Sequence, residues 1–458
     1  MMNIKSFIIR PAFWLMFIFL LVQQLIVASS NFWIIALIRD IQMNAMVYIS
    51  LSLYLASLLL PYIPGSIAII CQEKWKYALI LNLSESFKKN HHSNQKIWAD
   101  KDSKETRIAM LSNEGINALT DFTEYVYSLL STAMNVLFNV TALSILITGE
   151  FGVSYLISLA SVACLMKLQK SKQEKLSVKA QNARLSFLKV LLNSWDNIVL
   201  GNSYNFNLWE KKSDRVAQAL MNRNLYSIRF QQWFSVLIAI LTFIPSFFVV
   251  VQMVIKHHSN PLVLSAIAVT LPRLFMILNF TYDLLQSAFC WPSQKMILDK
   301  VKTMIGNNLE RPSFTQRIQW EKIRLQHNAF NEEEALELNI NSLEEIIKKS
   351  TSPGRLTIRG ENGSGKTSLL LAIKDTLKGS AFFLPVKHQL CFKHNTHYLS
   401  SGQGIKATLI EIRNFVNEKV ILLDEWDANL DNQNKEEISH LIDEIAQNRC
   451  VIEIRHRS

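Results

Sequence analysis

The eight residues Gly360-Glu-Asn-Gly-Ser-Gly-Lys-Thr367 fit the pattern G-x-x-x-x-G-K-[ST]. The stretch Leu356-Thr-Ile-Arg359 before them reads as a strand, and the apolar stretch Leu369-Leu-Leu-Ala372 after them reads as a helix. Glycines let the backbone N–H groups of such a loop point at phosphate oxygens, and the helix N-terminus adds positive potential. A glycine-rich turn without a ligand is the alternative, but it does not explain the strand–loop–helix order. The residues expected to bind a nucleotide here are Gly360, Asn362, Gly363, Ser364, Gly365, Lys366, Thr367 and Ser368.

A second segment, Val420-Ile-Leu-Leu-Asp424-Glu425, is an apolar strand that ends in two carboxylates. A carboxylate at the end of a buried strand can hold the water shell of Mg²⁺, so Asp424 and the hydroxyl of Thr367 are the expected metal ligands. Glu425 is placed to polarise an attacking water. Acidic strand ends are common, but this one lies 58 residues beyond Lys366 in an α/β pattern, which favours the catalytic interpretation.

Three further positions follow in chain order. Leu399-Ser-Ser-Gly-Gln403 lies between these two segments and opens a predicted helix, where it offers a hydroxyl and backbone N–H groups as a second phosphate cradle. Ser400 and Gly402 are the expected contacts, and Gln403 is counted with them among the nucleotide-binding residues. Asp431 follows the acidic pair. His456 comes after the last predicted strand, where a neutral imidazole is expected to contact a γ-phosphate; the alternative is a solvated histidine near the C-terminus.

The rest of this region predicts a parallel α/β sheet, because short β-branched or apolar runs alternate with helical stretches. Helices are expected after Lys366, after Gly402 and over residues 435–447. The expected strands are Arg355–Arg359, Ala381–Leu384, Val420–Leu423 and Val451–Ile454.

The N-terminal part of the chain is different, because it contains long stretches without charge. Lipid tolerates few ionised groups, and a spanning helix needs about 20 apolar residues. Six such spans are predicted, which gives residues 1–305 as a membrane domain and 306–458 as an α/β domain. The spans are Pro11–Ile38, Ile41–Gln72, Tyr125–Gly149, Phe151–Met166, Phe230–Ile255 and Pro261 to about Pro292.

The composition agrees with a chain that lies partly in lipid and partly in water: 49% of the 458 residues are hydrophobic, 19% are charged, and the net charge is +11. Residues 1–305 carry 28 basic and 16 acidic residues, whereas residues 306–458 carry 20 and 21. Most of the basic residues of the first part fall in two long loops, with 8 and 12 of them, so the charge reports membrane topology and not a nucleic-acid partner. Both loops and both termini are therefore expected on the cytoplasmic side, with the long loops continuing the spanning helices as helices beyond the membrane.

Three details of this part leave alternatives open. Lys5 and Arg10 before an apolar run resemble a signal peptide, but the run continues past Ser30 into Phe32-Trp33-Ile34-Ile35, which favours a retained first span. The five cysteines are scattered, so neither a disulfide framework nor a zinc site is indicated. Arg273 and Asp283 interrupt the sixth span, where they either line a substrate cavity or serve in snorkelling and helix pairing.

Taken in order, these motifs resemble those of the ATP-binding cassette (ABC) family. Gly360–Thr367 resembles its Walker A motif, Val420–Glu425 its Walker B motif, and Leu399–Gln403 its LSGGQ signature with Ser401 in place of a glycine. Leu430-Asp431 resembles the D-loop and His456 the switch histidine. With six spans ahead of them, the whole chain resembles an ABC exporter half-transporter, which implies ATP and Mg²⁺ as cofactors. It also implies a homodimer, or a paired half-transporter, in which Ser400 and Gly402 reach the ATP of the other copy.

The chain departs from the family pattern between the predicted strand Ala381–Leu384 and the signature. The family has a glutamine after that strand and then a helical subdomain of several dozen residues. Here Val386 occupies the position of that glutamine, and Gln389 is a displaced substitute. In place of the helical subdomain there are 13 residues, Val386 to Tyr398, before Leu399. Phe330 is the best candidate for an aromatic residue that stacks on adenine.

The resulting expectation is an ATP-hydrolysing exporter of a peptide or an amphiphilic small molecule in the bacterial inner membrane. The run Leu422-Leu-Asp-Glu-Trp426 is weakly similar to bacterial cyclic-peptide and siderophore exporters. The shortened cassette motivates an alternative: a nucleotide-binding membrane protein that does not pump, with an immunity or regulatory role or as a degenerate transporter.

Overall fold

The computed structural model divides the chain into two compact units, which we describe separately. The first comprises Met1–Asn90 and Arg107–Gly306, and the second comprises His91–Thr106 and Asn307–Ser458. Residues 91–106, which fall in the first long loop, thus belong to the same unit as the C-terminal domain. The structure describes residues 10–98, 104, 107–108, 110–146, 149–256, 261–305, 314–328, 336–338, 342–393, 400–428 and 430–455.

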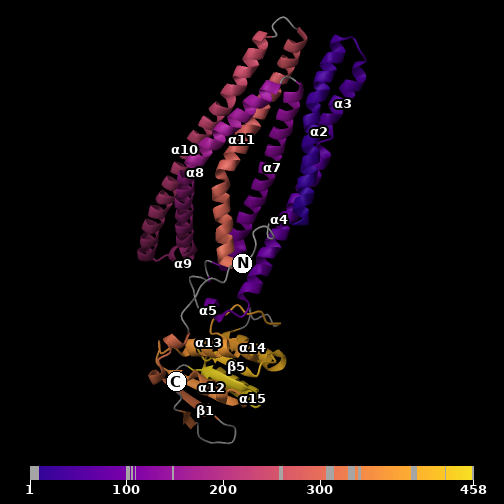
Figure 1. Cartoon of the computed structure of the whole chain (residues 1–458). Helices are drawn as coiled ribbons and strands as arrows, with labels where there is room; N and C mark the ends of the chain where they lie inside the picture. The colour runs from indigo at the N-terminus through magenta and orange to yellow at the C-terminus, as the bar shows by residue number, and fades with distance from the viewer. Residues whose placement is uncertain are drawn as a thin grey trace. The chain divides into compact units, whose positions relative to one another are not determined.

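The first unit consists of long helices (Figure 1). Charge-free apolar runs form helices in lipid because every backbone N–H and C=O must find its partner within the chain. The chain leaves the helical path at Pro61, whose ring nitrogen carries no N–H, so the predicted second span is split into two helices. The helices are α2 (Pro11–Gln42), α3 (Val47–Leu59), α4 (Tyr62–His91), the π-helical turn η1 (Met110–Glu114), α7 (Gly115–Leu146), α8 (Gly149–Leu192), α9 (Ser194–Val199), α10 (Ser203–Lys256) and α11 (Pro261–Ile305).

Among the described residues, five helical segments are long and apolar enough to cross a membrane: Pro11–Gln42, Val47–His91, Gly115–Leu146, Gly152–Leu192 and Ser203–Lys256. The sixth predicted span lies on α11, and its role as a span stays a prediction. Helices α8, with 44 residues, and α10, with 54, are much longer than the roughly 20 residues a membrane crossing needs. These two helices run well past the bounds of the predicted spans, into both sides of the second long loop, and their continuation beyond the membrane stays a prediction.

The helices of this unit pack through buried apolar clusters. Helix α8 lies along α10, and α2 packs against α3 and α7. Trp75 of α4 is fully buried, with its ring centroid 5.1 Å from that of Phe13 and 6.3 Å from that of Phe122. These contacts join α2, α4 and α7.

The second unit is built on a six-stranded sheet in the order β2-β1-β3-β6-β5-β4. The last four strands in that order run parallel, which confirms the predicted parallel strands, whereas β1 pairs antiparallel with both β2 and β3. The strands are β1 (Ile323–Asn328), β2 (Leu336–Leu338), β3 (Gly354–Gly360), β4 (Ala381–Leu384), β5 (Val420–Asp424) and β6 (Cys450–Ile454).

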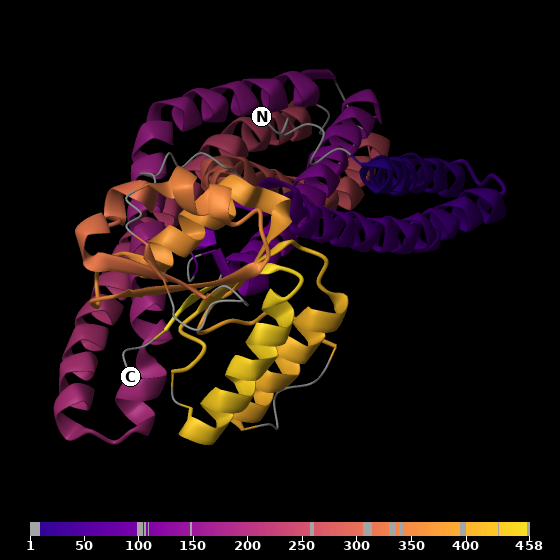
Figure 2. The same ribbon diagram turned by 90° about the horizontal axis from the view of Figure 1, so that it is seen from below.

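Helices cover both faces of this sheet, as Figure 2 shows. Helix α13 (Lys366–Leu377) packs on one face, and α14 (Ser401–Phe415) and α15 (Asn432–Ala446) lie side by side on the other. Alternate residues of β5 face the two layers: Leu422 packs on the α13 side and Leu423 on the α14–α15 side. Burial on both faces explains why β4, and β5 up to Leu423, are continuous apolar runs. The short elements are α5 (Gln95–Trp98), η2 (Phe314–Arg317), η3 (Trp320–Lys322), α12 (Leu343–Lys349) and η4 (Lys378–Ser380).

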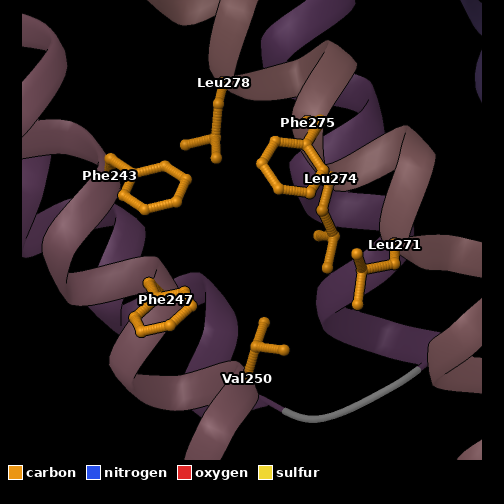
Figure 3. Close-up of a pocket in the computed structure, with 7 residues that line it drawn as sticks. All are labelled: Phe243, Phe247, Val250, Leu271, Leu274, Phe275 and Leu278. Atoms are coloured by element: carbon orange, nitrogen blue, oxygen red, sulfur yellow. The ribbon is translucent and has the colours of Figure 1, made fainter.

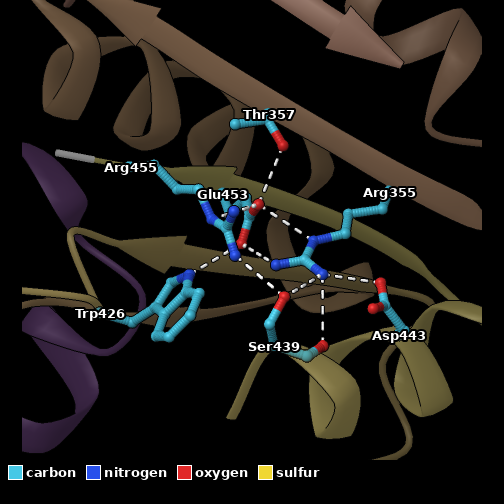
Figure 4. Close-up of polar contacts among 7 residues, drawn as sticks. All are labelled: Arg355, Thr357, Trp426, Ser439, Asp443, Glu453 and Arg455. Atoms are coloured by element: carbon cyan, nitrogen blue, oxygen red, sulfur yellow. Dashed lines mark hydrogen bonds and ion pairs between the residues drawn. The ribbon is translucent and has the colours of Figure 1, made fainter. Parts of the chain in front are cut away.

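A charged pair is buried within the sheet unit (Figure 4). Arg355 of β3 donates to both carboxylate oxygens of Glu453 on β6, from Nε at 3.0 Å and from Nη2 at 2.9 Å. Glu453 is fully buried, and it also accepts from the hydroxyl of Thr357 at 2.9 Å and from Nε1 of Trp426 at 2.7 Å. Because Trp426 follows Glu425 directly, this cluster fixes the turn after β5.

Candidate nucleotide site

The loop between β3 and α13 has a backbone that only glycine fits at two positions. Gly365 has a φ of 90°, and a Cβ there would lie 2.3 Å from the carbonyl oxygen of Arg317. At Gly360, a Cβ would lie 2.5 Å from the carbonyl oxygen of Lys322. The segment before β1 therefore packs directly against the loop and holds it in place, a contact that the sequence pattern did not predict.

The polar groups of the loop are gathered around its own backbone. The Nζ of Lys366 donates to the carbonyl oxygens of Gly360 at 2.8 Å and Glu361 at 3.0 Å. The hydroxyl of Ser364 is buried and has no hydrogen-bond partner among the described residues. The first N–H groups of α13 have no acceptor within the helix. An anion at this helix N-terminus would satisfy these donors, and Asn362, Gly363 and Ser368 lie in the same loop and first turn.

Across the sheet edge, Thr367 and Asp424 meet. The Thr367 hydroxyl donates to the Asp424 carboxylate, at 3.1 Å from Oδ1 and 3.2 Å from Oδ2. Asp424 ends β5 and is buried; burial is the main cause that raises the pKa of this carboxyl from 3.8 to about 6, while the Thr367 hydroxyl opposes that shift. The half-buried Thr367 hydroxyl and the buried Asp424 carboxylate, beside the Gly360–Thr367 loop, fit a Mg²⁺ ion that takes its remaining ligands from phosphate and water. Among the described residues no group of three His, Cys, Asp or Glu side chains could hold a metal, so protein ligands alone would not build this site.

Glu425, next to Asp424, has an unusual backbone. Its φ is 45°, in the left-handed region that non-glycine residues rarely adopt, and its N–H donates to the carbonyl of Ile454 at 3.1 Å. Strained residues of this kind cluster at functional sites. Glu425 thus directly follows the end of β5, at the sheet edge where β3 leads into the Gly360–Thr367 loop.

The other predicted residues form a second group at the N-termini of α14 and α15. Ser400 caps α14 through a capping box: its hydroxyl accepts from the N–H of Gln403, and the Gln403 side chain accepts from the N–H of Ser400. Asp431 caps α15 by accepting from the N–H of Asn434 at 2.8 Å. A Cβ on Gly402 would lie 2.9 Å from the side chain of Asn434, so the two helix starts pack closely.

Three predicted residues lie outside the described part of the chain: Leu399, His456 and Phe330. The strand before His456, β6, is paired between β3 and β5, the two strands that lead into the loop and the carboxylates. The described site residues thus fall into two groups. The first is the Gly360–Thr367 loop with Asp424 and Glu425, and the second is Ser400 to Gln403 with Asp431.

The region where the chain departs from the family pattern is short in the structure as well. Between β4 and α14, residues 385–393 and 400 are described, and they contain neither helix nor strand. A different segment contacts β4: the ring of Trp98, on α5, lies edge-on against Phe383 with centroids 5.5 Å apart. Helix α5 also contacts α13, which follows the phosphate loop. Sequence alone gave no signal for this contact, since the two residues are 285 positions apart.

The helix bundle has two features of its own. Arg273 donates to side chains of α2, which supports helix pairing as one role of this residue, and Asp283 is exposed. A cavity of about 80 Å³ between α10 and α11 is lined by apolar side chains only (Figure 3). Its lining residues are Phe243, Phe247, Val250, Leu271, Leu274, Phe275 and Leu278. This lining suits an apolar group and offers nothing to an ion.

Comparison with known proteins identifies the fold. No family model matches the sequence, and no curated protein matches it. Among solved structures, the chain is similar to a bacterial Atm1-family ABC exporter with ATP bound, with a TM-score of 0.53 and 12% sequence identity. The match covers 96% of this chain and 90% of that one. The chain therefore has the fold of an ABC exporter.

Proposed function

We propose that this chain is an ATP-driven exporter, acting as one half of a dimer. The observation that carries the proposal is the pairing of Thr367 with Asp424 beside a glycine-constrained loop, on the fold of an ABC exporter. In this proposal Lys366 and the loop N–H groups bind the ATP phosphates, Thr367 and Asp424 hold Mg²⁺, and Glu425 positions the attacking water. Ser400, Gly402, Gln403 and Asp431 contact the nucleotide of the other copy, and His456 senses the γ-phosphate.

The membrane role rests on the helix bundle. Its apolar helices suit a multi-pass membrane protein, and the basic residues of the long loops favour a cytoplasmic cassette. We place the protein in the bacterial inner membrane, where it moves a peptide or amphiphilic small molecule outward.

The contact of Trp98 with Phe383 supports coupling between hydrolysis and transport. Trp98 belongs to the loop that joins two predicted spans, and it packs on β4 within the second unit, which we call the nucleotide unit. This contact gives movements of the nucleotide unit a direct route into that loop, although the helical subdomain of the family is reduced.

The catalytic assignment is tested by ATP turnover of the purified full-length protein in lipid nanodiscs. Glu425→Gln is expected to lower turnover by about 100-fold or more, since it removes a group that acts on the reacting water. The matched control is Glu344→Gln, which makes the same change on the exposed face of α12. Equal rates for the wild type and Glu425→Gln would refute the assignment.

A second candidate function is a nucleotide-binding membrane protein that does not pump. The short connection between β4 and α14, without helix in its described residues, is the observation that favours it. ATP-dependent accumulation of labelled peptides in inverted vesicles would exclude this candidate. ATP hydrolysis without accumulation of any of them would favour it.

A further inference from the structure

Arg273 of α11 is a half-buried cation inside the helix bundle. One of its nitrogens, Nη1, donates to the hydroxyl of Ser30 at 2.7 Å and to Oδ1 of Asn31 at 2.5 Å, both on α2. The guanidinium also lies 5.9 Å from the ring centroid of Tyr54 on α3. Its Nε and Nη2 have no acceptor among the described residues. Half of the guanidinium fork is thus available.

The acceptor side of this arrangement is fixed by a chain of amides between α2 and α7. Asn31 is fully buried and donates from Nδ2 to Asn139 at 2.7 Å, which turns its carbonyl oxygen towards Arg273. Asn139 donates to Asn135, and Asn135 donates to Gln24 at 2.8 Å. The position of Arg273 is therefore set by a connected network, and the free edge of its guanidinium is held in one direction.

The charge of Arg273 has no carboxylate partner in this network. Its contacts on α2 and α3 are the hydroxyl of Ser30, the amide of Asn31 and the phenol ring of Tyr54. Asp283 lies ten residues along α11, about 15 Å by helical rise, and Asp40 lies nine residues along α2 from Asn31, about 14 Å. Arg273 itself is 12 residues from the start of α11, about 18 Å into the bundle.

A permanent cation at that depth is expensive, and neutral polar residues would pair the helices as well. A cation held there with an open donor edge indicates a ligand with the opposite charge. A guanidinium fork matches the two oxygens of a carboxylate.

We propose that the open edge of Arg273 binds the carboxylate of an amphiphilic cargo, with the ring of Tyr54 alongside. The inference rests on the proposed transport function and names the class of cargo: molecules that carry a carboxylate on an apolar body. A phospholipid phosphate shares the oxyanion chemistry, so the experiment must separate the two sources.

The test is a fluorescence titration of the full-length protein in phosphatidylcholine nanodiscs, without nucleotide. The probes are two dansyl-labelled leucine peptides of the same sequence, one with a free C-terminal carboxylate and one amidated. The wild type is expected to prefer the carboxylate form, and Arg273→Gln to bind it about tenfold more weakly, without a change for the amide. Arg273→Lys keeps the charge and the contacts to α2 but lacks the fork, and is expected to lose most of the preference. Arg39→Gln removes an exposed charge of α2 and is the matched control.

Each result decides the proposal. Equal affinity for the two peptides in the wild type, or an unchanged preference in both Arg273 variants, would overturn it. The titration is repeated in nanodiscs of the anionic lipid phosphatidylglycerol. This bilayer repels the carboxylate peptide in every variant, and the binding by Arg273→Gln measures that repulsion. If that lipid abolishes the preference of the wild type, the occupant is a lipid phosphate and the cargo proposal is wrong. Because the titration needs no ATP, it stands apart from the Glu425→Gln test, which can fail on its own.

Discussion

The ring of Trp98 lies edge-on against Phe383, with centroids 5.5 Å apart, within the second unit, although the segment of Trp98 lies between two predicted membrane spans. Edge-to-face aromatic pairs add about 0.5–1.5 kcal/mol to the energy of burial. The pair therefore contributes a small stabilisation to the packing of α5 on β4.

If the proposed function holds, Trp98→Ala is expected to uncouple the second unit from the helix bundle. ATP turnover should stay within about twofold, because the phosphate loop and Asp424 are untouched. In the wild type, ATP with vanadate should change the tryptic pattern of the basic loop over residues 167–229, and in Trp98→Ala this change should disappear. Trp98→Phe keeps an aromatic contact and is the control. A tryptic response that survives in Trp98→Ala would show that the contact does not transmit the nucleotide signal.

Asp424→Asn is expected to stabilise the protein while it removes magnesium-dependent function. Burial raises the pKa of Asp424 from 3.8 to about 6. Between these two pH values the folded protein keeps a proton on this carboxyl, whereas the unfolded chain has released it. The buried carboxylate therefore lowers the free energy of unfolding of the wild type. This loss is absent below pH 4, grows as the pH rises to about 6, and reaches roughly 2–3 kcal/mol above that.

The measurement is the melting temperature in nanodiscs, without Mg²⁺ and nucleotide, from pH 4 to pH 8. Asp424→Asn should melt a few degrees above the wild type at pH 8 and at the same temperature at pH 4. Mg²⁺ with ATP should raise the melting temperature of the wild type alone. A variant that is less stable than the wild type at pH 8 would contradict the proposed burial cost.

These results show which parts of the fold the sequence could predict. The strands β4 and β5 were predictable because burial on both faces leaves continuous apolar runs such as Val420–Leu423. The strand β6 has short apolar and β-branched stretches on either side of Glu453, and β3 was predictable because the Gly360–Thr367 motif follows it directly. The strand β1 alternates apolar and polar residues from Ile323 to Asn328 and lies outside the parallel set, and β2 has only three residues. Neither gives a signal that separates a strand from a loop.

Some residues of the candidate site could likewise be predicted from the sequence, and others could not. Thr367 and Asp424 were predictable because the local motif and the end of a strand fix them. The carbonyl of Arg317 against Gly365, and Trp98 against Phe383, depend on how distant segments fold onto one another, and no local pattern encodes them. The partners of Arg273 on α2 could not be predicted for the same reason.

The buried pair of Arg355 and Glu453 gives a prediction about stability. Glu453→Gln leaves the guanidinium of Arg355 without its buried counter-charge, so the free energy of unfolding should fall by about 3–5 kcal/mol. The double variant Arg355→Met with Glu453→Gln should lose less than Glu453→Gln alone, since no unpaired charge remains buried. Chemical denaturation of the purified protein would measure both variants. The single variant Arg355→Met completes the comparison. If the double variant loses as much free energy of unfolding as the two single variants together, Arg355 and Glu453 are not energetically coupled.

Two glycines of the phosphate loop form a matched pair that separates backbone strain from close packing. Gly363 and Gly365 have φ values of 86° and 90°, so alanine is strained at both by about 1–2 kcal/mol. A Cβ at Gly363 meets nothing within 4 Å, whereas a Cβ at Gly365 would lie 2.3 Å from the carbonyl of Arg317. Gly363→Ala should therefore be folded and mildly destabilised. Gly365→Ala must in addition displace the segment before β1, so it should lose more stability and most of its affinity for a fluorescent ATP analogue. If the two variants bind the analogue equally well, the packing of Arg317 on the loop does not shape the nucleotide site.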